Sequence, residues 1–277
     1  MKLQFILPFL FLALSLSCSK KESPEFSAPE LPELREIKHQ VLLEPTVSVS
    51  CGACPLAHHK VEQIEMENQQ VNHISHYLHG PLYHEYTSYL IERINKTIYT
   101  PLSHVNRRHD GESVTYYPVN MLEEVVDQEL LDGSEIGLEA SFTKQEDELL
   151  FEIELFSHNE DLDGEYLVTV LLVERLVTGE GSGYNQRNYG NDDPDHPFYQ
   201  QGDWIQGFEH TNVIRHVITP DEGEAVLLDE KSGTWSGNID ASSLSSNVES
   251  YDLIAFITKK ADKVMPILNS ITLPLNE

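Results

Sequence analysis

The sequence Ser50-Cys51-Gly52-Ala53-Cys54-Pro55 joins two segments with different patterns of apolar residues. Residues 40–49, just before it, are rich in Val, Leu and Thr, which is typical of a β-strand. Just after it, apolar residues recur at the i, i+4 and i+7 positions of a helix with one buried face: Ala57, Val61 and Ile64. Pro55 suits the first turn of such a helix, because the N–H that proline lacks has no intrahelical partner there. The two cysteines therefore lie where a strand passes into a helix.

Up to residue 133 the pattern keeps alternating between strand and helix. We expect a strand over residues 71–78, a helix over 86–96, and short extended pieces over 102–106 and 113–117. A third helix is expected to begin at Asn120, because Glu123 follows at the spacing of a capping pair.

This order of elements, with a C-x-x-C at the first junction of strand and helix, resembles the thioredoxin fold. The resemblance covers residues 40–133. A thioredoxin-like domain carries a cis-proline opposite the cysteines, at the start of its third strand, and Pro101 stands at that point. The resemblance therefore implies that Pro101 is cis and faces Cys51 and Cys54.

From residue 134 onwards the pattern becomes that of an all-β protein. Seven segments look like strands: residues 136–142, 151–155, 167–173, 213–218, 234–239, 253–257 and 268–273. Residues 167–173 are apolar apart from Thr169, as expected of a central strand that is covered on both faces. We therefore predict that residues 134–277 form an antiparallel β-sandwich, so that the fold class is α/β followed by β.

The composition argues against two classes of binding partner. The 277 residues include 46 acidic and 18 basic side chains, for a net charge of −28. A phosphate-rich partner needs a surplus of Lys and Arg, so neither nucleic acid nor an anionic membrane surface is expected. Beyond the first 17 residues the chain has no apolar run of about 20 residues, the length that a membrane-spanning helix requires.

Residues 1–17 have the features of a lipoprotein signal peptide. Lys2 supplies a positive charge, residues 3–16 are almost entirely apolar, and a small residue precedes Cys18. Cleavage there would leave Cys18 as the acylated first residue, which anchors a protein to a membrane without spanning it. Residues 18–39 are rich in Pro and Glu and predict a disordered tether. The residue after Cys18 is not an aspartate that would retain the protein in the inner membrane, which favours the outer membrane.

Apart from Cys18, the chain has two cysteines, Cys51 and Cys54, which is too few for a disulfide scaffold. If the pair is redox-active, Cys51 is the nucleophile and Cys54 resolves the mixed disulfide. Pro101 would then present its neighbouring backbone to an incoming peptide. If the pair is inactive, it is a permanent disulfide that closes a small loop. The sequence leaves both interpretations open.

A metal site is a third interpretation of the same residues. His58 follows Cys54 by four residues, so both point from one face of the predicted helix. Together with Cys51 they would offer two thiolates and one imidazole, ligands that suit Cu(I) or zinc. The other histidines lack a mutual spacing that would predict ligands, and no cofactor is predicted.

Residues 179–209 form a long polar, glycine-rich stretch without periodicity. This stretch is either a binding loop or a mobile insertion, and its aromatic residues would suit recognition: Tyr184, Tyr189, Phe198, Tyr199 and Trp204. The acidic run at residues 191–195 could hold a calcium ion weakly. Residues 159–164 begin like a calcium loop, but the twelfth position is Val170 where a glutamate is needed, so we interpret them as a hairpin turn.

Three short motifs are similar to those of the twenty-eight-kilodalton outer membrane protein family of Bacteroidetes. They are Cys51-Gly-Ala-Cys54-Pro55, Pro101 followed by Val105-Asn106-Arg107, and His210-Thr211-Asn212-Val213-Ile214-Arg215. The resemblance implies a thioredoxin-like domain followed by a β-sandwich. His210 and Arg215 are interpreted as structural, since no nucleophile or acid–base pair lies near them in the sequence.

The sequence therefore predicts an outer-membrane-anchored lipoprotein of the cell envelope that acts through protein interactions. The alternative is a thiol–disulfide oxidoreductase acting on exported proteins, and a copper or zinc carrier ranks third. Hydrolase, kinase and dehydrogenase functions have no support, because the chain lacks a Ser-His-Asp order, a phosphate loop, a dinucleotide fingerprint and an H-E-x-x-H pattern.

Overall fold

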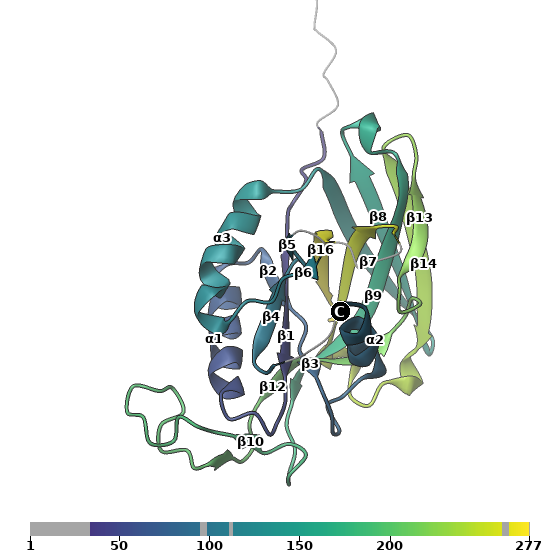
Figure 1. The fold of residues 1–277 in the computed structure, drawn as a ribbon. Coiled ribbons are helices and arrows are strands. Elements are labelled where there is room, and N and C mark those ends of the chain that lie inside the picture. The colour runs from purple at the N-terminus through teal and green to yellow at the C-terminus, as the bar shows by residue number, and fades with distance from the viewer. Residues whose placement is uncertain (1–33, 95–98, 111–112, 262–265, 277) are drawn as a thin grey trace, which may run out of the picture. The chain divides into compact units, whose positions relative to one another are not determined.

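The computed structural model describes residues 34–94, 99–110, 113–261 and 266–276. The predicted signal peptide, Cys18 and the tether up to residue 33 lie outside these ranges. By their contacts, Arg35–Glu277 form one compact unit of mixed α/β structure with several sheets (Figure 1). The predicted domain boundary between residues 133 and 134 falls between a helix and a strand of this unit.

The first sheet is built around β1 (Val41–Val47), whose seven residues are all buried. On one side β1 pairs in parallel with β2 (Val71–His73) and β3 (His76–Tyr77). On the other side it pairs in antiparallel fashion with β4 (Leu102–Val105). The predicted strand over residues 71–78 is therefore two short strands, and the predicted piece over 102–106 is β4.

Helices α1 (Cys54–Glu67) and α3 (Leu122–Asp132) pack on one face of this sheet, as Figure 1 shows. Alternate side chains of β1 make this packing possible, because Val41 and Leu43 share an apolar core with Val61 of α1 and Val126 of α3. The remaining helix, α2 (Glu85–Ile94), contributes Tyr86 to the core on the opposite face of the sheet.

The start of α3 differs from the prediction. A short 3-10 helix, Val119–Met121, precedes it, and the N-cap position is Met121, without a capping hydrogen bond from a side chain. The capping pair of Asn120 and Glu123 is therefore wrong, because Asn120 lies inside the 3-10 turn that leads into the helix. A small antiparallel pair, β5 (His109–Asp110) and β6 (Ser113–Val114), lies between β4 and this turn.

The rest of the chain forms two larger antiparallel sheets. The five-stranded sheet consists of β12 (His210–Val217), β9 (Gly164–Val177), β15 (Tyr251–Lys259) and β16 (Ile267–Pro274), with β13 (Glu224–Leu228) paired to the first part of β9. The three-stranded sheet consists of β14 (Ser232–Asp240), β8 (Glu148–Ser157) and β7 (Ile136–Gln145). All seven predicted strands are present, and β13 is a further strand that the pattern did not indicate. Three 3-10 turns complete this part: Glu160–Leu162, Ala241–Ser243 and Val248–Ser250.

Strand β9 is buried on both faces, as its apolar run predicted. Val168, Val170 and Leu172 point into a core shared with the three-stranded sheet. Leu171 and Val173 point the other way, into a core that also contains Leu42 of β1 and Tyr86 of α2. The five-stranded sheet therefore packs against the three-stranded sheet on one face and against the β1 sheet on the other.

The connection between β8 and β9 is not the predicted hairpin turn. The two strands belong to different sheets, so the chain crosses from one sheet to the other. The crossing uses the 3-10 turn Glu160–Leu162, where the side chain of Asn159 accepts a hydrogen bond of 3.0 Å from the Asp161 N–H. An alternating pattern marks both strands but does not tell which strand each one pairs with.

None of the described helices is both long enough and apolar enough to cross a membrane.

Candidate functional site

Cys51 and Cys54 form a disulfide at the junction of β1 and α1, with a Cα–Cα distance of 5.4 Å. β1 ends at Val47, and Cys54 is the first residue of α1, so the cysteines lie where the sequence predicted them. The exposed fraction of Cys54 is 0%, whereas Cys51 is partly buried. Of the two sulfur-bearing residues, Cys51 therefore lies nearer to solvent.

The Thr100–Pro101 peptide bond is cis, as the resemblance to the thioredoxin fold implied. Thr46 of β1 is paired with Leu102 of β4, so Pro101 lies at the end of the sheet where β1 leads into the cysteine turn. The catalytic role expected for Pro101 stays a prediction.

The turn that carries the disulfide is covered by residues 179–209, which we call the covering loop. Two short strands of this loop, β10 (Gln186–Arg187) and β11 (Trp204–Ile205), pair with each other. The loop also bonds to the cysteine turn, because the Arg187 N–H donates to the Val49 carbonyl and the Tyr189 N–H donates to the Gly52 carbonyl, each at 2.8 Å. Figure 1 shows β10 beside the ends of β1 and α1.

Gln186 is the residue that joins the loop most closely to the cysteine turn. Its side chain is fully buried, and its Nε2 donates to the Cys51 carbonyl at 2.8 Å. The carbonyls of Ser48 and Val49 lie 3.2 and 3.3 Å from the same nitrogen. The Cys51 N–H donates to the Ser48 carbonyl and the Cys54 N–H to the Cys51 carbonyl, so the Gln186 amide adds a second donor to carbonyls that the turn already pairs.

Tyr189 lies directly on the backbone of the motif. A Cβ atom built on Gly52 would lie 2.3 Å from Cδ1 of the Tyr189 ring, which no real side chain could tolerate without movement. Glycine at position 52 therefore permits the close approach of the loop. The Arg187 guanidinium lies 5.3 Å from the Tyr189 ring centroid and 5.6 Å from that of Trp204, so it links two aromatic residues of the loop.

A buried hydrogen-bonded chain of aromatic residues lies behind Cys54. His210 Nε2 is 2.7 Å from the Tyr184 carbonyl and therefore carries a proton. Burial lowers the pKa of His210, so its Nδ1 is unprotonated and accepts from the Tyr77 hydroxyl at 2.7 Å. The Tyr77 oxygen in turn accepts from His58 Nε2 at 3.0 Å. Burial, together with the nearby His210 and His73, lowers the pKa of His58 to about 3, so its imidazole is neutral.

These contacts assign structural positions to residues that the sequence singled out. His210 and Tyr184 fasten the covering loop to the first sheet, and Arg215 donates to Glu174 at 2.8 Å and to the Pro81 carbonyl at 3.2 Å. The first part of the covering loop is therefore held at Tyr184, Gln186, Arg187 and Tyr189, by contacts that the sequence could not indicate because their partners are distant along the chain.

The geometry does not assemble the metal site that Cys51, Cys54 and His58 suggested. Both sulfurs are bonded to each other, and His58 Nε2 donates to Tyr77. Within the described ranges, no group of three or more His, Cys, Asp or Glu side chains lies where it could hold a metal ion. In the acidic run at residues 191–195, the Asp193 carboxylate accepts a hydrogen bond of 3.1 Å from the Asp195 N–H.

A buried ion pair that the sequence analysis missed lies in the middle of β1. Glu44 has an exposed fraction of 0%, and Arg107 donates to its two oxygens at 2.8 and 2.7 Å. Burial alone would raise the pKa of Glu44, but Arg107 and His76 more than offset it and hold the pKa well below its usual range. The signal was a glutamate inside an otherwise apolar strand. Because Arg107 also bonds to the Tyr86 hydroxyl at 3.0 Å, the pair has the features of a structural cluster.

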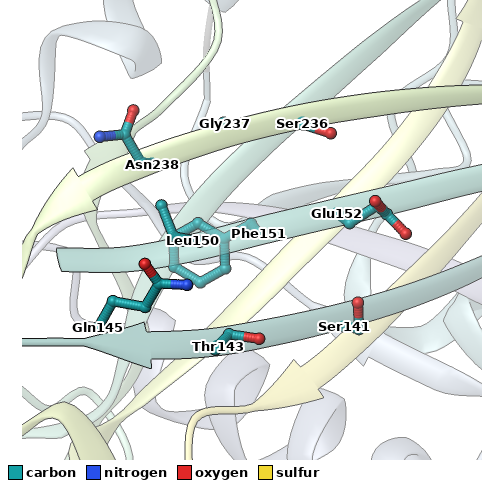
Figure 2. A pocket seen from close by; sticks show the side chains of 9 residues that line it. All are labelled: Ser141, Thr143, Gln145, Leu150, Phe151, Glu152, Ser236, Gly237 and Asn238. Atoms are coloured by element: carbon teal, nitrogen blue, oxygen red, sulfur yellow. The ribbon is translucent and has the colours of Figure 1, made fainter.

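A concave surface lies on the outer face of the three-stranded sheet, where Figure 2 shows polar side chains of β7, β8 and β14. The cavity has a volume of about 570 Å³. Glu152 is the one ionisable residue among those that line it, beside the uncharged Thr143, Gln145 and Asn238. This surface therefore carries no group of residues with an evident chemistry.

Comparison with known proteins supports the fold. The chain is similar to the structure of HBP35 of Porphyromonas gingivalis, with a TM-score of 0.65, 16% sequence identity and coverage of 86% of this chain and 76% of that chain. A domain of the outer membrane lipoprotein Omp28 from Porphyromonas gingivalis is also a neighbour, at 13% identity over 52% of this chain and 89% of that chain, with a TM-score of 0.32. The likeness to HBP35 shows a shared fold. No protein-family model and no curated protein matches the sequence.

Proposed function

We propose that this chain is a lipid-anchored protein of the bacterial outer membrane that acts through protein interactions. Its first half, residues 40–133, is a thioredoxin-like domain, and its second half, residues 134–277, is an antiparallel β-sandwich. The Cys51–Cys54 disulfide is a structural element of the first domain in its resting state, because the covering loop closes over it.

The topology of the first sheet supports the thioredoxin-like assignment. β1 has parallel neighbours on one side and an antiparallel neighbour on the other, and its end leads through the disulfide into α1. The shared core of the three-stranded and five-stranded sheets supports the β-sandwich assignment, since both sheets are antiparallel and bury side chains against each other.

The sequence of residues 1–18 supports the lipid anchor. The test is mass spectrometry of the protein extracted from its own membrane. We expect an N-terminus at Cys18 that carries acyl chains, and release of the Cys18→Ser variant from the outer membrane fraction. An unmodified N-terminus at Met1 in the exported protein would contradict the anchor.

The observation that carries the assignment of the disulfide is the set of bonds from the covering loop to the cysteine turn. Thiol–disulfide exchange needs a thiolate to approach one sulfur along the S–S axis. Gln186, Arg187 and Tyr189 all bond to backbone carbonyls within the turn, so a protein substrate could reach Cys51 only if the loop moved.

The rate of reduction of the disulfide tests this assignment. The oxidised protein is exposed to dithiothreitol, once folded and once unfolded in urea. The reaction is quenched with iodoacetamide, and mass spectrometry measures the fraction of protein with alkylated cysteines. We expect reduction of the folded protein to be slower than that of the unfolded protein, because local opening must precede attack. Equal rates, or catalytic turnover of a protein disulfide by the folded protein, would contradict a covered structural disulfide.

Thiol–disulfide oxidoreductase activity is the second candidate, and the different burial of the two cysteines favours it. Cys51 is partly buried and Cys54 fully buried, the order that an attacking and a resolving cysteine need. In the oxidising direction, a substrate dithiol would lose two electrons and two protons to the disulfide and leave Cys51 and Cys54 as thiols. The pH dependence of Cys51 alkylation in the reduced protein tests it, since a thiol with an ordinary pKa of about 8.5 would count against catalysis.

A further inference from the structure

A cavity of about 270 Å³ lies between α1 and the last part of the covering loop. Helix α1 contributes His58 and Glu62, and the loop contributes Phe198, Phe208 and Glu209. The volume is close to the lower end of the range for small-molecule sites, which begins at about 300 Å³. Neither Cys51 nor Cys54 lines this cavity, so binding there does not require the proposed function.

The wall of this cavity is aromatic. The ring of Phe208 has an exposed fraction of 6% and lies 5.6 Å from His58 and 5.7 Å from Phe198, measured between ring centroids. His59, in the next position of α1, packs edge-on against Phe198 at 6.2 Å. Because these rings support one another, the wall is fixed in place before any ligand arrives.

The charged side chains that line the cavity are both carboxylates, Glu62 and Glu209, and no Lys or Arg is among the lining residues. Glu62 accepts a hydrogen bond of 3.1 Å from the Thr211 hydroxyl. Neither glutamate takes part in an ion pair within the part of the chain that the structure describes. His58 adds no positive charge, since burial holds its imidazole neutral. Two carboxylates without a cationic partner therefore face an aromatic wall.

We propose that this cavity binds an organic cation, namely the ammonium or guanidinium group of a small amine or of a basic side chain. An aromatic face attracts a cation through its electron-rich centre, and a neighbouring carboxylate supplies the opposite charge and accepts hydrogen bonds from the N–H groups of the cation. An anion would be repelled by both glutamates. A neutral apolar ligand would leave the Glu62 carboxylate partly desolvated with the Thr211 hydroxyl but no cation as its partner, which is unfavourable. The net charge of −28 draws cations towards the protein as a whole.

Three probes of similar size test the charge requirement: n-butylguanidinium, n-butylammonium and the neutral n-butylurea. Each is titrated into the intact folded protein, with its Phe ring signals followed by NMR on ¹³C-labelled phenylalanine. We expect the two cations to shift the Phe198 and Phe208 signals in a saturable manner and the urea to leave them unchanged. Equal binding of n-butylurea, or no saturable shift with either cation, would overturn the proposal.

Variants locate the binding. Glu62→Gln and Phe198→Ala should each weaken n-butylguanidinium roughly three- to tenfold, the effect of losing one charge-assisted or cation–π contact. Glu67→Gln, an exposed glutamate at the end of the same helix, is the matched control and should leave the affinity unchanged. An equal loss in all three variants, or none in the first two, would overturn the assignment to this cavity. Because Glu62 and Phe198 are only partly buried, the variants should remain folded, which circular dichroism checks.

A final comparison distinguishes the two sources of the cation. Agmatine is titrated beside a short peptide with one arginine flanked by glycine and serine. Tighter binding of agmatine supports a small amine as the occupant, and tighter binding of the peptide supports a basic side chain of a partner protein. Failure of both ligands would overturn the proposal.

Discussion

The side-chain amide of Gln186 donates to the backbone carbonyl of Cys51 at 2.8 Å, across a separation of 135 residues. This bond makes the covering loop and the cysteine turn one hydrogen-bonded unit. Opening the loop breaks the contacts of the Gln186 amide with the carbonyls at 48, 49 and 51, together with the bonds that the Arg187 and Tyr189 N–H groups make to the turn. Since an intramolecular hydrogen bond contributes about 0.5–1.5 kcal/mol, the closed arrangement is favoured and access to the disulfide follows from its opening.

Gly52→Ala should open the loop. The new Cβ would collide with the Tyr189 ring, so the ring and the Tyr189 N–H bond to position 52 must shift. Loss of about 1.4 kcal/mol of closing free energy would make the open form about tenfold more populated, and reduction by dithiothreitol correspondingly faster.

A double-mutant cycle separates this effect from a change within the motif. In a Tyr189→Ala background the ring is already absent, so adding Gly52→Ala should change the rate of reduction little further. If both single variants and the double variant act additively, the clash with Tyr189 does not explain the effect.

Arg107→Leu should destabilise the protein strongly. The substitution leaves the Glu44 carboxylate buried without its partner, and breaking a buried ion pair in this way costs about 3–5 kcal/mol. Chemical denaturation measures the free energy of unfolding. Arg35→Leu, which removes the more exposed ion pairs to Glu139 and Glu154, is the control and should cost less than about 1 kcal/mol. Similar losses for the two variants would show that the Glu44–Arg107 pair contributes no more than a surface pair.

His58 should make the protein less stable in acid. Its pKa is about 3 in the folded protein, against 6.5 for an unperturbed histidine, because the imidazole is buried next to other histidines. The unfolded chain therefore binds a proton first as the pH falls, and this contribution to stability is complete above pH 6.5 and declines below it.

The measurement is the free energy of unfolding of His58→Gln and of the unaltered protein at several pH values. Glutamine keeps an N–H that can donate to Tyr77 but does not titrate. Between pH 6.5 and about 4, the difference between the two proteins should change in favour of the variant by up to about 1.4 kcal/mol per pH unit. A difference that does not depend on pH would contradict a neutral buried His58.

The elements with a strong local signal could be predicted from the sequence. The spacing of Ala57, Val61 and Ile64 predicted α1, and all three side chains are buried. The continuous apolar run of residues 167–173 predicted a strand covered on both faces, because such a strand has no polar face that could contact solvent. Strand β13 was missed, since it has five residues and its last four, Ala225 to Leu228, are all apolar, although Ala225 and Leu227 are exposed, so the sequence shows no alternation.

The candidate site could be predicted only in its local part. Cys51 and Cys54 are three residues apart, so their place at the junction of strand and helix follows from nearby sequence, whereas the sequence left the state of the pair open. The bonds of Gln186 and Tyr189 to the cysteine turn connect segments far apart in the chain, and glutamine and tyrosine in a polar loop carry no sign of such partners. The same reason hid the Glu44–Arg107 pair, whose members are 63 residues apart.

The most direct test of the covered disulfide is the rate at which dithiothreitol reduces it in Gln186→Ala. Removing the amide deletes the side-chain hydrogen bond that joins the loop to the Cys51 carbonyl, and we predict reduction roughly two- to tenfold faster than in the unaltered protein, as expected for the loss of a hydrogen bond worth about 0.5–1.5 kcal/mol. Gln145→Ala, an exposed glutamine at the end of β7, is the control and should leave the rate unchanged. An unchanged rate in Gln186→Ala, with the fold intact by circular dichroism, would contradict the claim that the loop controls access to Cys51 and Cys54.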